Sequence, residues 1–308
     1  MNIIRYYNQN KKSIWIIIIA IILIIIAIQA LNSIVKNQNS NRVVENTVKA
    51  EDYKNNLSVD ILLSDTDVRE EKELIVDQFI RYCNAKEIEK AYNLLTEDCK
   101  KNIFPTIEYF KQNYVEKIFN TKKLYSKEKF ISSTYKVKLY EDILSTGNID
   151  TSTVEDYYTI EKEDGKTKLN ISNYIGYKQI NTTSKGNIIE VKVIGKNVYK
   201  EYEEYELEVS NLTNKTILLD SKENTRTMYL TGKNNVKYYA LSHELLQDEL
   251  MLKPKMTKVV FIKFTKEYNS NTTINDLIFS DIIKDYELYN TKESKREYLD
   301  RDKITINL

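Results

Sequence analysis

The hydrophobic residues of this chain follow three patterns in succession: an unbroken run, then a helical spacing, then an alternation. In the run, Gln29 is the only polar residue between Ile14 and Leu31. About 20 apolar residues span the hydrocarbon core of a membrane, whereas a cleaved signal peptide has an apolar core of about 7–15 residues. The sequence AIQALNS at its end is a poor match to a cleavage site. Residues 14–35 are therefore predicted to form an uncleaved transmembrane helix.

The charges around this run predict its orientation. Arg5, Lys11 and Lys12 precede it without any acidic residue, whereas basic and acidic residues are mixed after it. Because Lys and Arg accumulate on the cytoplasmic side of a membrane, residues 1–13 are expected to be a cytoplasmic tail, and the bulk of the chain is expected to be extracytoplasmic. Residues 36–66 carry too few apolar side chains to offset the entropy of ordering, and they are predicted to be a linker.

Helical spacing begins at residue 67. Asp67 and Glu70 fit a capping box, which places the start of a helix there. A second helix is expected after the segment NAK, and a third after Pro105, with Thr106 as its N-cap. Apolar residues three or four positions apart mark one face of each helix: Leu74, Ile75, Phe79, Tyr82 and Cys83 in the first, Ile88, Ala91, Tyr92 and Leu95 in the second, and Ile107, Phe110, Tyr114 and Ile118 in the third.

Alternation of apolar and polar residues begins near residue 130 and predicts β-strands. All six glycines lie within residues 147–232, which fits strands joined by tight turns, because glycine disfavours helices and permits positive φ. The sequence around Asp164-Gly165 is a strong hairpin signal. Residues 67–178 are therefore predicted to be three helices followed by a small antiparallel sheet.

The rest of the chain is dominated by short strands. Residues 187–290 contain alternating segments, such as EYELEVSNLT and TKVVFIKF, with polar turns between them. Short strands at regular spacing are typical of a β-sandwich. The polar residues 179–186 are predicted to be a connector between the two folded parts, and the charged residues 291–308 are predicted to be a loosely held tail.

Two resemblances to known families follow from these segments. The sequence IVDQFIRYCNAKEIEKAYNLLTEDCKKNIFPTIEYF resembles the helices of the nuclear transport factor 2-like superfamily, whose fold is an α+β cone of helices against a curved sheet. The sequences YELEVSNLTNKTILLDS, LTGKNNVKYYA and KVVFIKF resemble strands of the immunoglobulin-like (telokin-like) domains of Gram-positive surface proteins. The implied fold class is a membrane-anchored α+β plus all-β protein: one amino-terminal transmembrane helix, the cone, then the immunoglobulin-like β-sandwich. Neither family carries one fixed function.

Composition argues against one class of partner. The 308 residues carry 46 basic and 45 acidic side chains, which gives a net charge of +1. Because there is no basic excess to neutralise phosphates, we do not expect nucleic-acid binding. The length is sufficient for roughly two domains.

Few residues have the chemistry or the spacing of an active site. Cys83 ends the first helix and Cys99 lies beyond the second, so we expect two buried free thiols too far apart for a disulfide. His243 is expected in a surface loop, since no nucleophile and orienting acid are evident around it. The spacings typical of zinc, calcium and nucleotide sites do not occur. We therefore predict no catalytic residue, no metal and no cofactor.

The interior of the helical part has two interpretations. One is an ordinary core of apolar side chains at helical spacing, supplied by Leu94, Leu95, Phe104, Phe110 and Phe119. The other is a ligand cavity, which would need convergent polar groups, usually an Asp with a His or Tyr, and no such set is evident. A charged group among the inward-facing sheet positions near Tyr135, Val137 and Leu139 would favour the cavity.

The leading hypothesis is a non-enzymatic bitopic membrane protein that acts as an extracytoplasmic scaffold or binding module of the bacterial cell envelope. Its layout is similar to the inner-membrane core subunits of type IV secretion systems, although the added sandwich departs from that pattern. Expected partners are the membrane and other envelope proteins or a second copy of the chain. Tyr238 and Tyr239 are candidate contacts, because aromatic anchors dominate interfaces, but strand alternation also allows one to be packed and the other exposed. The competing hypothesis is an enzyme or small-ligand carrier that uses the cone cavity.

Overall fold

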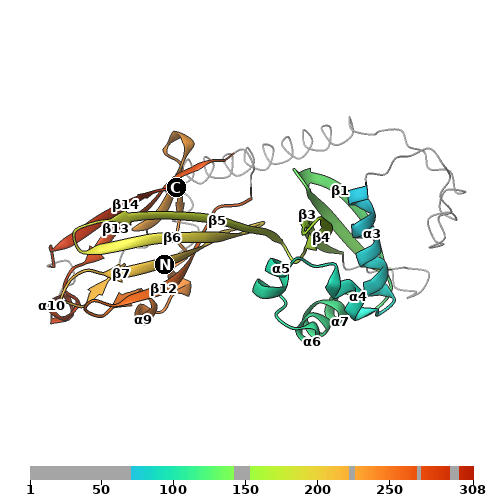
Figure 1. Cartoon of the computed structure of the whole chain (residues 1–308), viewed down its shortest axis with the longest axis horizontal. Helices are drawn as coiled ribbons and strands as arrows, with labels where there is room; N and C mark the ends of the chain where they lie inside the picture. The colour runs from blue at the N-terminus through green and yellow to red at the C-terminus, as the bar shows by residue number, and fades with distance from the viewer. Residues whose placement is uncertain (1–70, 142–152, 222–225, 269–271, 292–297) are drawn as a thin grey trace, which may run out of the picture. The chain divides into compact units, whose positions relative to one another are not determined.

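The computed structural model describes residues 71–141, 153–221, 226–268, 272–291 and 298–308 (Figure 1). These residues belong to one compact unit, Arg69–Leu308. The predicted cytoplasmic tail, transmembrane helix and linker lie outside the described residues, and so does the predicted capping box at Asp67. Within the described ranges, no helix combines the length and the hydrophobicity needed to cross a membrane.

The predicted helices are present, but the second and third are subdivided. Thr96 caps a separate helix, because its side chain accepts a hydrogen bond from the Cys99 N–H at 2.9 Å. Thr106 caps the next helix as predicted, and it accepts from the Tyr109 N–H at 3.1 Å. The helices are α3 (Glu71–Asn84), α4 (Ile88–Asn93), α5 (Glu97–Asn102), α6 (Ile107–Phe110), the π-helical turn η1 (Lys111–Val115) and α7 (Glu116–Ile118).

A four-stranded antiparallel sheet follows the helices in the order β1-β2-β3-β4. Asp164 and Gly165, with φ of 50° and 76°, form the predicted tight turn between β3 and β4. Tyr135, Val137 and Leu139 on alternate positions of β2 are buried in one cluster with the apolar faces of the helices. The strands are β1 (Lys123–Ile131), β2 (Thr134–Glu141), β3 (Val154–Glu163) and β4 (Lys166–Asn170).

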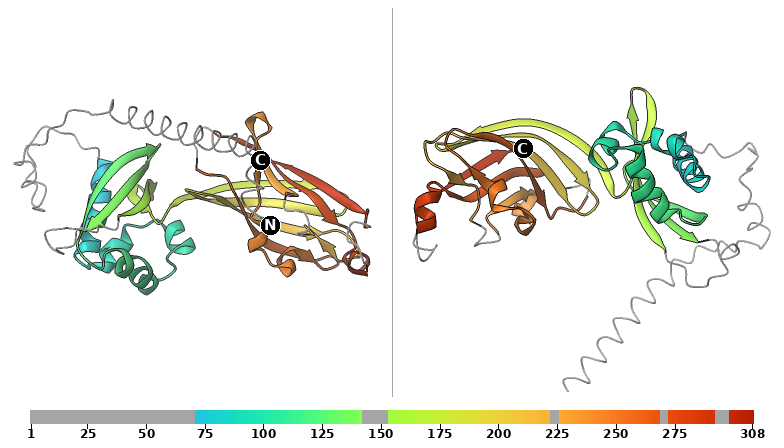
Figure 2. Two further views of the ribbon diagram at one scale, coloured as in Figure 1. Left: turned by 180° about the vertical axis from the view of Figure 1, so that it is seen from behind. Right: turned by 90° about the horizontal axis from the view of Figure 1, so that it is seen from below.

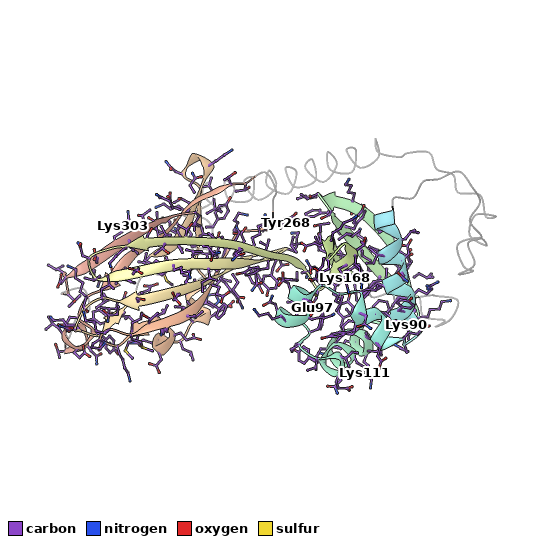
Figure 3. The ribbon with its side chains drawn as sticks, in the orientation of Figure 1. Lys90, Glu97, Lys111, Lys168, Tyr268 and Lys303 are labelled. Atoms are coloured by element: carbon purple, nitrogen blue, oxygen red, sulfur yellow. The ribbon has the colours of Figure 1, made fainter. Side chains whose placement is uncertain are left out.

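Backbone contacts also fix the sheet to the helices. Leu95 forms a parallel bridge with Leu169 of β4, and the Thr96 N–H donates to the Leu169 carbonyl at 3.0 Å. Figure 3 labels Glu97 and Lys168, which mark the place where α5 meets β4. The start of α5 is therefore set by a strand far along the chain as well as by its own cap.

The remaining strands form two antiparallel sheets that share one hydrophobic core, with strand orders β12-β7-β6-β5 and β10-β9-β13-β8-β11; β14 pairs with β13. Buried and partly exposed side chains alternate along β6 and β7, as the sequence predicts. The strands are β5 (Tyr174–Lys185), β6 (Ile189–Tyr199), β7 (Glu203–Asn211), β8 (Ile217–Leu218), β9 (Met228–Gly232), β10 (Lys237–Tyr239), β11 (Met251–Leu252), β12 (Thr257–Phe264), β13 (Ile274–Ile283) and β14 (Arg301–Asn307). Short helices η2 (Lys233–Asn235), η3 (Ser242–Glu244), α9 (Gln247–Leu250) and α10 (Tyr286–Thr291) lie between them.

Two segments differ from their predicted roles. Residues 179–186, expected as a connector, lie in β5 as far as Lys185 and pair with β6. They are polar because β5 is an edge strand, where alternate side chains meet water. Residues 291–308, expected as a loose tail, include β14, in which Ile304 and Ile306 are buried while charged residues take alternate positions. Figure 2 shows this carboxyl-terminal strand running along the sandwich.

Candidate functional site

Three polar side chains meet inside the helical part, although the sequence gives no sign of them. Asp156 and Tyr158 point to the same face of β3, and Tyr114 reaches them from η1. The Tyr114 Oη donates to the Asp156 Oδ2 at 2.7 Å and lies 2.7 Å from the Tyr158 Oη. All three residues are buried, and Asp156 pairs across the sheet with Val137. The structure therefore brings together an Asp–Tyr set in this interior that the sequence does not make evident.

Asp156 also organises the backbone around it. Its Oδ2 accepts from the Tyr114 Oη at 2.7 Å and the Ser172 N–H at 3.1 Å, and its Oδ1 accepts from the N–H groups of Tyr157 at 2.7 Å and Asn173 at 2.8 Å. Ser172 and Asn173 have φ of 63° and 60°, so both are left-handed in the turn between β4 and β5. An ionised carboxylate offers about four lone-pair sites. These donors occupy that capacity, and the carboxylate holds the turn.

Burial dominates the ionisation of this cluster. It raises the pKa of Asp156, against the opposing effect of the hydrogen bonds from Tyr114 and from the backbone. Burial, followed by the nearby charge of Asp156, raises the pKa of Tyr114 and of Tyr158 well above the ordinary value, so both phenols stay protonated at neutral pH. Proton exchange between this cluster and solvent requires the surrounding core to open.

Aromatic rings fill the space around the cluster. Phe79 meets Tyr158 edge-on with ring centroids 5.6 Å apart, Phe110 stacks on Tyr114 at 5.7 Å, and Phe104 meets Tyr114 edge-on at 5.5 Å. The predicted core residues are all part of this packing, with Leu94 partly buried against the cluster and the rest buried: Leu95, Phe104, Phe110 and Phe119. Their interpretation as core is confirmed.

A second buried polar network lies in the sandwich. Glu203, at the start of β7, is 2% exposed. Its Oε2 accepts from the Lys196 Nζ at 2.7 Å and the Tyr205 Oη at 3.0 Å, and its Oε1 accepts from the Lys266 Nζ at 2.8 Å. Burial opposes ionisation of Glu203, but the two ammonium groups outweigh it and lower its pKa. Burial lowers the pKa of Lys196 despite the attraction of Glu203.

The predicted contact residues Tyr238 and Tyr239 lie on β10, and both are half-buried. Tyr238 packs against the sandwich core. The Tyr239 ring meets Tyr229 with centroids 6.0 Å apart, and the Arg226 guanidinium lies 5.2 Å from the Tyr239 ring centroid. Each tyrosine therefore combines packing with exposure, and its role as a partner contact stays a prediction.

The other residues considered from the sequence are placed as expected. Cys83 and Cys99 are free and buried in the helical core. Burial raises the pKa of Cys99 to about 12 and also raises that of Cys83, so neither thiol is ionised at neutral pH. His243 is exposed in the turn η3. In the part of the chain that the structure describes, no three His, Cys, Asp or Glu side chains are grouped to hold a metal ion.

The sandwich presents an exposed apolar edge. Strand β12 is the last strand of its sheet and pairs with β7 along its whole length. On its other side, the Leu241 N–H donates to the Lys263 carbonyl at 2.8 Å, and the Lys258 Nζ donates to the Asp248 carbonyl of α9 at 2.8 Å. No strand of the described residues pairs with the part before Lys263. Val259 and Phe261 are 46% and 48% exposed there. We call residues Thr257–Phe261 the open edge.

A row of acidic side chains lies next to the open edge. Glu204, Glu206 and Glu208 of β7, here called the acidic row, pair across the sheet with Lys263, Phe261 and Val259 respectively. The Lys263 Nζ is engaged by the Glu244 carboxylate at 3.0 Å. Among the described residues, neither Glu206 nor Glu208 forms an ion pair. The acidic row therefore places three carboxylates beside the open edge, with Lys192 of β6 in register with Glu208.

Comparison with known proteins gives no match to a family model, a curated protein or a solved structure. The functional argument therefore depends on the geometry of the chain itself. That geometry comprises two buried polar networks, which are satisfied from within the fold, and one exposed apolar edge beside a row of three carboxylates.

Proposed function

We propose that this protein is a bitopic, membrane-anchored scaffold or binding protein of the bacterial cell envelope, with its folded part outside the membrane. The length of the apolar run over residues 14–35 supports the anchor, and the basic residues before it support a cytoplasmic amino terminus. Helices against an antiparallel sheet, followed by two sheets around one core, support the nuclear transport factor 2-like and immunoglobulin-like assignments. A conjugation- or secretion-type machine is the setting that this layout favours.

The open edge is the observation that carries the binding role. Proteins protect exposed strand edges with charges, prolines or bulges, because unpaired N–H and C=O groups accept another strand. Here the large exposed side chains of the edge are apolar, namely Val259 and Phe261. A partner that covered them would bury apolar surface and satisfy the edge backbone at once. A binding function accounts for both features.

Photo-crosslinking in producing cells tests this role. A photoreactive residue in place of Phe261 should give one discrete adduct with another envelope protein or with a second copy. The matched control replaces Tyr109, which is 47% exposed on α6, and should give no adduct. Protease added to intact wall-less cells should remove the folded part. Protection of the folded part, or equal labelling from both positions, would contradict the proposal.

A second candidate function is an enzyme or small-ligand carrier that uses the interior of the helical part. The cluster of Asp156, Tyr114 and Tyr158 favours it, because this is the kind of convergent set that such a site needs. The substitution Tyr158→Phe discriminates the two, since it removes one hydroxyl and keeps the ring. Loss of function in cells with unchanged folding and unchanged crosslinking at position 261 would support the enzyme or carrier.

A further inference from the structure

We infer that the open edge binds an extended, basic segment of a partner protein, which joins the four-stranded sheet as a fifth strand. The inference depends on the proposed binding role and specifies the chemistry of the partner. Its segment alternates Lys or Arg with apolar residues over about five positions, the length of the open edge. Three features support this occupant: the direction of the β12 backbone groups, the exposure of Val259 and Phe261, and the charge of the acidic row.

The backbone of β12 is already arranged to accept a strand. The Lys263 carbonyl points away from β7, since it accepts from the Leu241 N–H, and Thr265 donates to the Tyr239 carbonyl at 3.0 Å. Residues two positions apart in a strand direct their N–H and C=O groups to the same side. Val259 and Phe261 therefore direct theirs away from β7 as well. A partner strand would continue the ladder that residues 239–241 begin.

Two other edge strands of the described sheets, β5 and β1, expose mainly polar side chains. At the opposite edge of the same sheet, β5 exposes Gln179, Asn181 and Thr183. On the sheet of the helical part, the edge strand β1 exposes Glu128 and Lys129, together with Phe130, which is 36% exposed and packs edge-on against Tyr157. Polar and charged side chains discourage the addition of a strand. Of these three edge strands, β12 has the two most exposed apolar side chains, Val259 and Phe261, which lie two positions apart on one face.

Charge selects the partner. Strands in a sheet lie about 4.8 Å apart, so a strand added to β12 would lie about 10 Å from the acidic row. The stem of a Lys or Arg on that strand can lie across Val259 and Phe261 while its charged end reaches Glu206 or Glu208. A second copy paired edge to edge would present Thr257, Val259 and Phe261 to the row, and none of these is basic. The basic segment is therefore the better complement.

Peptide binding to the full chain in detergent micelles tests the inference. The probe is a fluorescent seven-residue peptide that alternates Lys and Val, and its counterpart carries Glu in place of Lys. Fluorescence anisotropy should show at least tenfold tighter binding of the basic peptide, with a salt dependence that the double variant Glu206→Lys/Glu208→Lys reduces. Val259→Pro should abolish binding, because it removes an outward N–H at an edge position where proline is tolerated.

Two further variants keep the test decisive. Phe261→Lys replaces Val259→Pro if circular dichroism shows that the proline variant is misfolded, and it should weaken binding about tenfold or more. Val236→Lys is the matched control, because Val236 is 48% exposed outside the open edge, and it should leave binding unchanged.

Several results would overturn the inference. These are unaltered binding in the edge variants, equal binding of the two peptides, no binding of the basic peptide, or a dimer that dissociates in the edge variants and assigns the edge to a second copy. A crosslinked partner at position 261 whose contacting segment is acidic or helical would overturn the inference and leave the proposed function standing. Binding of the basic peptide without any adduct in cells would support the inference about the open edge and contradict the proposed function.

Discussion

The molecule has two carboxyl groups that are equally hidden from water, Asp156 in the helical part and Glu203 in the sandwich. Their pKa values shift in opposite directions. Asp156 is 3% exposed and Glu203 is 2% exposed. Asp156 meets neutral donors, namely a phenol and backbone N–H groups, and its pKa is raised by burial. Glu203 meets two ammonium groups, and its pKa is lowered despite burial.

The difference shows that burial alone does not decide the charge of a group. Hydrogen bonds from neutral donors stabilise a carboxylate, but a full opposite charge in a low-dielectric setting stabilises it more. The two sites consequently have different structural roles. Asp156 fixes a turn between two strands, whereas Glu203 neutralises the buried Lys266 and the partly exposed Lys196.

Removal of Glu203 should cause the largest loss of stability. Glu203→Ala leaves Lys196 and Lys266 without their counter-charge, and breaking a buried ion pair in this way costs about 3–5 kcal/mol. Denaturant unfolding of residues 69–308 measures the change in the free energy of unfolding. Glu206→Ala, on the outer face of the same strand, is the matched control and should change it by less than about 0.5 kcal/mol. Similar losses in the two variants would show that the network is not buried in solution.

Removal of the Asp156 carboxylate should destabilise the fold less than removal of Glu203 does. Asp156→Asn keeps the size of the side chain but replaces one acceptor oxygen by an NH₂ group. In either orientation the NH₂ group faces two donors: the N–H groups of Tyr157 and Asn173, or the Tyr114 hydroxyl and the Ser172 N–H. Leaving buried donors unsatisfied costs about 1–3 kcal/mol. The same unfolding experiment measures it. A loss as large as that of Glu203→Ala would show that the contrast between neutral and charged partners has been overstated.

The two carboxylates should also respond oppositely to pH. The pKa of Glu203 is lowered in the fold, so its contribution is present above the unfolded pKa, near 4.5, and is lost as the pH falls through the folded value. The pKa of Asp156 is raised, so its contribution is fully present below the unfolded value of 3.8 and is lost as the pH rises through the folded one.

Unfolding measured between neutral pH and about pH 3 checks these signs. On acidification, the stability difference between the native chain and Glu203→Gln should narrow, and that between the native chain and Asp156→Asn should widen. Parallel pH profiles for the two variants would refute the opposite assignments.

The smallest loss of stability should come from removing the Tyr158 hydroxyl, and removing the Tyr205 hydroxyl should cost more. The Tyr205 hydroxyl donates to the charged Glu203 at 3.0 Å, and hydrogen bonds to charged groups contribute about 1.5–3 kcal/mol. The Tyr158 hydroxyl lies 2.7 Å from a neutral phenol, Tyr114, for which about 0.5–1.5 kcal/mol is typical. Tyr205→Phe should therefore destabilise the protein more than Tyr158→Phe in thermal unfolding. The reverse order would contradict the assignment of charge to Glu203.

Local patterns predicted the elements of this fold well. The cap at Thr106, the Asp164-Gly165 turn and the alternating strands β6 and β7 all depend on neighbouring residues, and the structure has each of them. The misplaced segments have a common cause. Residues 179–186 and 291–308 are rich in polar residues, and a polar edge strand resembles a linker or tail until its pairing partner is known.

The candidate sites divide in the same way. Buried free thiols at Cys83 and Cys99 and a surface position for His243 were expected from the sequence alone, and the structure has both. The cluster of Tyr114 and Asp156 joins residues 42 positions apart, so no local pattern could indicate it. The open edge could not be predicted from the sequence either, because the order of strands in the sheet decides which strand is last.

The sequence by itself determined the periods of the helices and strands, the tight turns, and which side chains are apolar enough to be buried, because these depend on bonds and neighbours a few residues apart. Only the tertiary structure decided which buried polar groups meet. It placed a neutral phenol beside Asp156 and two ammonium groups beside Glu203, and that placement gives two similar carboxylates opposite pKa shifts. It also left residues 257–261 of β12 without a pairing strand on one side among the described residues, because the end of a sheet is set by pairing between distant strands.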